Sequence, residues 1–140
     1  MVFIIDEGST FDAPIEKVWR FMQMGREQHK HVGRTNMKIE PQGDSSILSF
    51  ETEGPGGNKI QNRNKSTSFP PVGRVVEYLE GPLAGSRAVT YYIPMGQKTG
   101  ITVVGEFVSK TIPEAQIKSV VMEIFEKSFN EDVENLKNFH

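Results

Sequence analysis

The stretch IPEAQIKSVVMEIFEKSFNEDVENLKNF, residues 112–139, decides the fold because its pattern predicts one long amphipathic helix. Pro113 suits the first helical turn, where its missing N–H costs nothing, and Glu114 favours the positive end of the helix dipole. Apolar residues then recur at helical spacing: Ile117, Val120, Val121, Ile124, Phe125, Phe129 and Leu136. At about 1.5 Å per residue, this helix is roughly 40 Å long. An apolar stripe of that length must pack along another element, and we expect a sheet.

The chain before this helix has the pattern of strands separated by turn residues. The first strand covers residues 2–11, where apolar side chains alternate before the pattern turns polar. Six further strands are predicted over residues 35–41, 45–53, 58–69, 72–80, 86–93 and 101–110. Glycine and proline pairs such as Gly81-Pro82 separate them. The fold class is therefore α+β, with a curved seven-stranded antiparallel sheet around the long C-terminal helix.

Two short helices are expected between the first and second strands. Pro14 starts the first one, and apolar residues at i, i+3, i+4 and i+7 give it one buried face: Ile15, Val18, Trp19 and Met22. Residues 25–32 are predicted to form a second short helix or an irregular turn. We expect this pair to close one end of the sheet.

Length and composition indicate a single soluble domain. Its 140 residues are 36% hydrophobic and 24% charged, and a chain of this size buries roughly two-thirds of its surface. No apolar run approaches the ~20 residues of a membrane span, and the opening MVFII is too short for a signal peptide. We therefore expect a cytoplasmic protein with no integral membrane association. The absence of cysteine excludes disulfides, thiolate nucleophiles and Cys-based zinc sites.

Charge is distributed unevenly along the chain. Residues 1–52, 53–112 and 113–140 have net charges of −2, +3 and −3. The basic residues of the middle part are spread over several predicted strands, without the clustering that marks a nucleic-acid-binding surface. We interpret them as a solvated face and expect no nucleic-acid partner.

Three possible chemical sites are weak. His29 and His31 could form a metal pair in an extended segment, but helical spacing would point them roughly 200° apart. With no third ligand evident, we interpret them as exposed histidines of a connector and expect no metal and no cofactor. The glycines of residues 54–59 lack the spacing and the strand-to-helix context of a phosphate loop. A Ser-His-Asp triad is not expected, because the histidines lie in a connector or at the terminus.

Polar residues on a predicted strand are more informative. Four of them share one side of the strand over residues 58–69: Asn62, Asn64, Ser66 and Ser68. We favour an edge strand, where polar and charged side chains discourage pairing with other molecules. The alternative is a row of side chains that faces a partly polar, wet cavity.

The long helix also carries polar residues within its apolar stripe. Ser128 and Asp132 lie at i and i+4 near the middle of that stripe. A buried carboxylate costs free energy unless it is paired. We therefore expect Asp132 to be solvent exposed, with pairing to a residue such as Arg87 as the alternative.

The order of elements, the long final helix and the segment FDAPIEKVWRF, residues 11–21, resemble the START/Bet v 1-like (SRPBCC) superfamily, including polyketide cyclase/dehydrase-type proteins. The shared pattern is an Ala-Pro pair shortly before Val-Trp and an aromatic or apolar position. The resemblance covers nearly the whole chain. It implies a single START/Bet v 1-like domain over residues 1–140 with the helix-grip fold, in which sheet and helix enclose a deep cavity.

The resemblance leaves the activity open, because this superfamily includes lipid carriers, receptors and cyclases, and a fold does not specify a function. We favour binding or transport of a hydrophobic or amphipathic small molecule (a lipid, isoprenoid or polyketide-like compound) in the cavity. The first alternative is a cofactor-free cyclase or dehydratase acting on a polyketide-like substrate, with Arg87, Glu106 or a strand tyrosine moving protons. The second is a protein-interaction module with an unknown partner. No catalytic residue is assigned.

Ten residues are predicted to line the cavity or orient its ligand: Trp19, Phe50, Tyr78, Arg87, Tyr91, Phe107, Val121, Phe125, Ser128 and Phe129. Apolar members would form the walls, and the polar members would contact the polar end of the ligand. The mouth is expected near the short helices.

Overall fold

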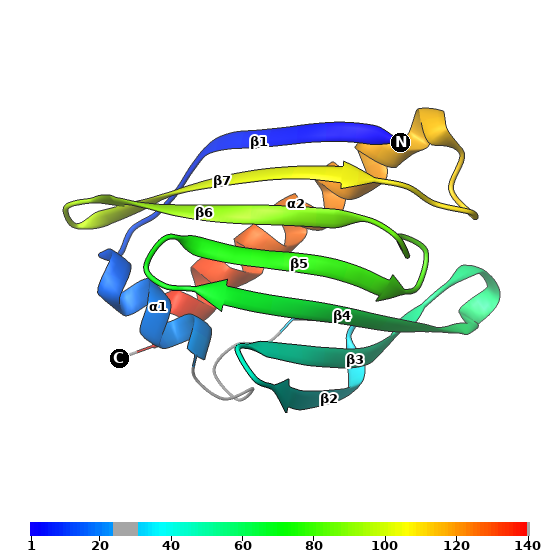
Figure 1. The fold of residues 1–140 in the computed structure, drawn as a ribbon, viewed down its shortest axis with the longest axis horizontal. Helices are drawn as coiled ribbons and strands as arrows, with labels where there is room; N and C mark the ends of the chain where they lie inside the picture. Colours follow the sequence, from blue (N-terminus) through cyan, green and yellow to red (C-terminus); the bar gives the residue numbers. More distant parts are fainter. Residues whose placement is uncertain (24–30, 140) are drawn as a thin grey trace.

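The computed structural model describes residues 1–23 and 31–139, and it has one curved antiparallel sheet with a long helix across its concave face (Figure 1). Within the described residues the strands are β1 (Val2–Phe11), β2 (Thr35–Gln42), β3 (Ser45–Glu53), β4 (Lys59–Phe69), β5 (Gly73–Glu80), β6 (Arg87–Met95) and β7 (Lys98–Phe107). The helices are α1 (Ile15–Gln23) and α2 (Glu114–Lys137), with a short 3₁₀ turn, η1 (Pro55–Gly57). The strand order β1-β7-β6-β5-β4-β3-β2 makes β1 and β2 the edges. This arrangement confirms the predicted fold class.

The predicted helix pair is described only in part. Helix α1 confirms the first helix, whereas residues 25–30, most of the segment expected to form the second one, lie outside the described residues. From His31 the described chain passes through a turn at residues 32–33 and enters β2 at Thr35. No helix in the described ranges has the length and apolar character needed to cross a bilayer.

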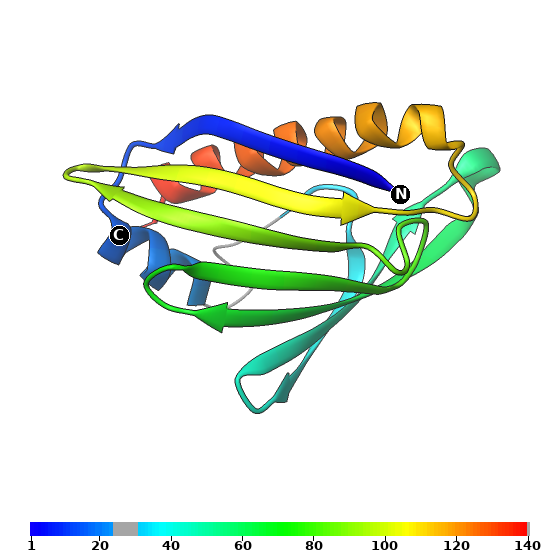
Figure 2. The ribbon, with the colours of Figure 1, turned by 45° about the horizontal axis from the view of Figure 1, so that its top comes forward.

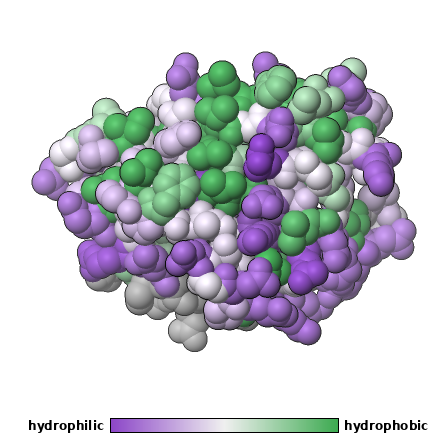
Figure 3. Space-filling model, in the orientation of Figure 1, coloured by the Kyte–Doolittle hydropathy of each residue, from purple (hydrophilic) through white to green (hydrophobic). Residues whose placement is uncertain are grey.

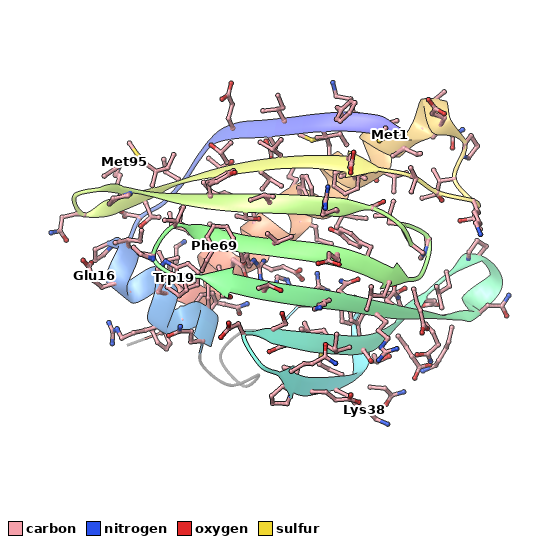
Figure 4. The ribbon with its side chains drawn as sticks, in the orientation of Figure 1. Met1, Glu16, Trp19, Lys38, Phe69 and Met95 are labelled. Atoms are coloured by element: carbon pink, nitrogen blue, oxygen red, sulfur yellow. The ribbon has the colours of Figure 1, made fainter. Side chains whose placement is uncertain are left out.

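Helix α1 is anchored to the sheet by its buried tryptophan. The indole N–H of Trp19 donates a hydrogen bond of 2.9 Å to the carbonyl oxygen of Pro71, in the turn between β4 and β5. The Trp19 ring also meets Tyr92 edge-on, with ring centroids 5.3 Å apart. Figure 4 shows Trp19 on α1 and Phe69 at the nearby end of β4. Trp19 thus joins α1 to the sheet through a polar and an aromatic contact, beside the apolar packing of Val18 and Phe21.

A bulge in β1 sets which of its side chains face inward. The register against β7 shifts between Asp6 and Ser9, around Gly8, whose φ of 93° suits glycine. Because the side-chain period of a strand is two, the extra residue places both Ile4 and Phe11 in the core. The same shift turns both Asp6 and Ser9 toward the interior.

The apolar core is divided into two clusters, one toward each end of α2, which crosses the concave side of the sheet (Figure 2). The cluster near the helix C-terminus contains Phe11, Ala13, Val18, Trp19, Phe21, Tyr92, Ile101, Leu136 and Phe139. The cluster near the N-terminus contains Ile4, Leu83, Ala88, Phe107, Ile117 and Val121. Between them, Phe125, Ser128 and Phe129 of α2 are only half-buried. At its middle the helix contacts the sheet through Phe125 and Phe129, whose rings lie 5.8 Å from Phe107 and 5.2 Å from Phe11, and it leaves a space beside them.

Apolar side chains also gather on the outer, convex face of the sheet, over β1, β7 and β6 (Figure 3). The exposed ones are Phe3, Ile5, Tyr91, Ile93 and Val104. The placement of Tyr91 in the cavity was wrong, because its side chain lies on this face and is 40% exposed. Arg87 was also misplaced, since it is exposed and forms a 3.4 Å ion pair with Glu106.

Candidate functional site

Two adjacent compartments lie between the sheet and the helices. The inner compartment, of about 220 Å³, separates the concave face of the sheet from the middle of α2. The outer compartment, of about 610 Å³, lies between α1 and the inner side of β2, β3 and β4. Both are lined by Met22, His31, Arg34, Leu48, Ser66 and Arg74. We call this shared set of residues the neck.

The inner compartment has apolar walls with polar groups at defined places. Its apolar lining comes from both layers of the fold: Phe11, Val76, Ala88, Ile101, Val103, Ile124, Phe125 and Phe129. Its polar lining includes Asn64, Thr90, Tyr78 and Tyr92 on the strands and Ser128 and Asp132 on α2. Such a mixture is typical of small-molecule sites, where few polar groups orient a largely apolar ligand.

The polar row of β4 faces this cavity. Asn64 and Ser66 line the inner compartment, and Ser66 and Ser68 line the outer one. The favoured interpretation of β4 as an edge strand was wrong, because it pairs with β3 on one side and β5 on the other. Asn62 differs from the other three, since its amide donates to Thr52 Oγ1 at 2.9 Å and it does not line either compartment.

Two arginines meet at the neck. Arg74 extends from β5, and its Nε is shielded from solvent without a hydrogen-bond partner in residues 1–23 and 31–139. Arg74 and Tyr92 both line the inner compartment. Arg34 immediately precedes β2 and lies over the Phe50 ring, 5.1 Å from its centroid. Because arginine stays protonated in proteins, the neck carries two positive charges.

Burial and neighbouring groups shift the pKa values of both arginines and of Tyr78. Burial, and then the charge of Arg74, lower the pKa of Arg34 from its ordinary value. Tyr92, and to a lesser degree Asp132, raise the pKa of Arg74 despite its burial. Burial also raises the pKa of Tyr78, although the two arginines partly oppose it. At neutral pH, Tyr78 is therefore a protonated phenol that can donate a hydrogen bond into the cavity.

His31 fastens the segment before β2 to α2. Its Nδ1 lies 2.9 Å from Glu131 Oε1, and its Nε2 lies 3.2 Å from Asp132 Oδ1. The second oxygen of Glu131 accepts a 2.8 Å hydrogen bond from the Val32 N–H. Two predictions were wrong here: His31 is not an exposed connector residue, and Asp132 is buried rather than exposed. The carboxylate is tolerated because His31, rather than Arg87, is its close partner.

Comparison with known proteins identifies the architecture. Neither the family models nor the curated proteins compared with the chain match it. Among solved structures, Ara h 8.0201, a Bet v 1 allergen, superposes with a TM-score of 0.74 at 14% identity, covering 98% of both chains. A START superfamily protein from Mycobacterium smegmatis gives 0.74 at 13% identity, covering 97% of both chains. The chain has the helix-grip fold of START and Bet v 1-like proteins.

The helix-grip fold also occurs in an enzyme among the similar structures. The Zhui aromatase/cyclase from Streptomyces sp. R1128 superposes with a TM-score of 0.69 at 12% identity, covering 96% of this chain and 92% of that one. Identities this low show a shared fold and leave the activity to be argued from the site.

Within the helix-grip fold, the ten predicted site residues lie in three environments. Tyr78, Phe125, Ser128 and Phe129 line the inner compartment, and Trp19 lines the outer one. Phe107 and Val121 are fully buried in the N-terminal cluster, and Phe50 is buried beside Arg34, so none of these three lines the cavity. Arg87 and Tyr91 lie on the outer face.

The sequence analysis did not single out Arg34 or Arg74 for the site, and it placed His31 and Asp132 in solvent, although both line the inner compartment. A signal existed for Arg74, which shares a side of β5 with Val76 and Tyr78 at the strand period of two. His29, the other half of the considered metal pair, lies outside the described residues. In the part of the chain that is described, no group of three or more His, Asp or Glu side chains is arranged to hold a metal ion.

Proposed function

We propose that the protein binds and carries a hydrophobic or amphipathic small molecule in its internal cavity. The observation that supports this is the space between the sheet and the middle of α2, which Phe125, Ser128 and Phe129 line. The outer compartment, at about 610 Å³, falls within the range of about 300–1,000 Å³ usual for ligand pockets. The inner compartment continues it past the neck between aromatic and aliphatic walls.

A thermal-shift panel tests this proposal. A ligand that binds only the folded protein adds about 2.7 kcal/mol at a hundred times its Kd. For a chain of this length that gain raises Tm by about 10 °C. We expect at least one stabiliser among fatty acids, isoprenoids, quinones, sterols and flavonoid-like polyphenols. Trp19, the only tryptophan, lines the outer compartment and gives an independent fluorescence signal.

Two matched variants test whether the ligand that raises Tm binds in the cavity. Phe125→Asp places a charge on the apolar wall and should abolish the shift, because an unpaired carboxylate there opposes apolar contact. Phe3→Asp makes the same change on the outer face and should keep it. The proposal fails if no apolar compound raises Tm and native mass spectrometry of the purified protein finds no bound molecule.

A cofactor-free cyclase or dehydratase acting on a polyketide-like substrate is the second candidate. The observation that favours it is the presence of Arg74, Tyr78 and Tyr92 on one cavity wall, where they could polarise a carbonyl group. Incubation with a poly-β-ketone thioester, followed by mass spectrometry, tests it. A product smaller by one water that forms faster with protein supports this candidate, and an unchanged substrate opposes it.

The protein-interaction alternative requires a closed interior together with an exposed apolar patch. The outer face carries such a patch, but the interior contains the two compartments described above. We therefore place this alternative third.

A further inference from the structure

We propose that the ligand is an organic acid whose carboxylate is bound by Arg74 and Arg34 at the neck, with its apolar part in the inner compartment. This inference rests on the proposed function and names the chemical class of the ligand. It is argued from the unpartnered nitrogen of Arg74, from the charge around the neck and from the position of the apolar wall.

Arg74 carries an unsatisfied hydrogen-bond donor at its Nε. Its Nε–H is shielded from solvent and has no acceptor among the described residues. A buried polar group without a partner is costly, and native proteins nearly always satisfy such groups. Because Arg74 lines both compartments, an oxygen of a molecule at the neck would be in a position to accept this hydrogen bond.

The second argument is the local charge. Arg34 and Arg74 bring two positive charges to the neck, and burial, followed by the charge of Arg74, lowers the pKa of Arg34. Asp132 interacts with both and also contacts His31 at 3.2 Å, while Asp6 lines the inner compartment and Asp44 the outer one. Glu131 is already engaged by His31 and the Val32 N–H. A second carboxylate at the neck would relieve the repulsion between the guanidinium groups.

The third argument is geometric. A guanidinium group presents parallel N–H donors that match the two oxygens of a carboxylate, which a neutral hydroxyl or carbonyl cannot do. On the adjacent strand β4, Ser68 pairs with Arg74 and Ser66 belongs to the neck, so two hydroxyl groups lie on the strand beside the guanidinium. Tyr78 remains a protonated phenol, because burial raises its pKa, and it can donate a hydrogen bond from the wall of the inner compartment.

The apolar part of the ligand follows from what lies beyond the neck. Ile101, Val103, Phe125 and Phe129 form the far wall of the inner compartment. Its volume of about 220 Å³ lies below the range of most drug-sized pockets. A short or medium chain, or a single aromatic ring, suits this space better than a sterol.

Calorimetry with three molecules that share one chain tests the proposal: octanoate, octanol and octylammonium at neutral pH. We expect octanoate to bind at least tenfold more tightly than octanol, a difference of 1.4 kcal/mol, and octylammonium to bind most weakly. Equal affinities for octanoate and octanol would overturn the anion site while leaving the proposed carrier function intact. No binding by any of the three would contradict the anion site, and the carrier function is then judged by the wider thermal-shift panel.

Three variants test whether Arg74 and Arg34 cause the tighter binding of octanoate. Arg74→Met should remove the preference for octanoate while octanol still binds, and Arg34→Met should reduce it. Arg87→Met is the matched control, because this arginine lies on the outer face, and it should retain the full preference. Circular dichroism checks folding, and if Arg74→Met does not fold, Arg34→Met decides. An unchanged octanoate preference in the folded variants would overturn the assignment to these arginines.

Discussion

Replacing Phe107 with alanine should destabilise the protein by about 4 kcal/mol, whereas the same change at Phe125 should cost only about 1–2 kcal/mol. Phe107 is fully buried in the N-terminal cluster and meets Tyr78 and Phe125 edge-on, with ring centroids 5.9 and 5.8 Å away. Its removal leaves a closed void, so the cavity cost adds to the lost transfer free energy. Phe125 is half-buried and already borders the inner compartment, so its removal only enlarges an existing space.

Urea unfolding and thermal melts measure both variants. At about 4 °C per kcal/mol for a chain of this length, the expected Tm losses are about 16 °C for Phe107→Ala and about 6 °C for Phe125→Ala. Because both changes remove the same atoms, the difference between the two Tm losses reports how tightly each side chain is packed. If Phe125→Ala costs as much as Phe107→Ala, the middle of α2 is packed against the sheet, and the cavity described here does not exist in solution.

Three further predictions concern stability. The pKa of Glu131 is lowered because hydrogen bonds from His31 and the Val32 N–H outweigh the opposing effect of burial. Ionised Glu131 therefore stabilises the fold fully above its ordinary pKa of 4.5. That stabilisation is lost as the pH falls through the lowered pKa of the folded protein. Glu131→Gln should flatten that acid limb of a stability–pH profile, and an unchanged limb would contradict the pairing. Truncation after Lys110 should abolish cooperative unfolding, since the concave face loses α2, and a truncated chain that still melts cooperatively would count against the architecture. Gly73→Ala should destabilise strongly, because the new Cβ would lie 2.1 Å from the backbone oxygen of Thr90; a Tm within a few degrees of the unchanged protein would show that β5 and β6 can separate.

Much of the fold could be predicted from the sequence because its signals are local. Alternation and turn residues mark the strands, and the predicted range of 45–53 matches β3 at both ends. The spacing of apolar residues predicts α2, whose observed range, Glu114–Lys137, falls just inside the expected helix. The bulge in β1 was missed, although Gly8 offered a hint, because register depends on the partner strand.

The site was harder to predict because facing depends on the whole sheet. Strand β6 carries apolar residues on both sides, so its pattern alone did not show which tyrosine faces the cavity. Tyr91 lies on the outer face and Tyr92 on the inner face. Charged residues were predicted to be exposed to solvent. Asp132 was therefore predicted to be exposed, and Arg74 was not predicted to line the cavity. Burial of either charge depends on partners distant in sequence, such as His31 for Asp132, and one sequence does not reveal such pairs.

The division of the core into two clusters has a consequence for the behaviour of the protein under hydrostatic pressure. Unfolding eliminates the space enclosed between the clusters, and pressure favours the state with the smaller volume. The empty protein should therefore unfold at a lower pressure than the occupied one, because a ligand fills the space that compression would otherwise remove. The midpoint pressure of unfolding, followed by Trp19 fluorescence, then reports how completely a ligand fills the interior, whatever its chemical class.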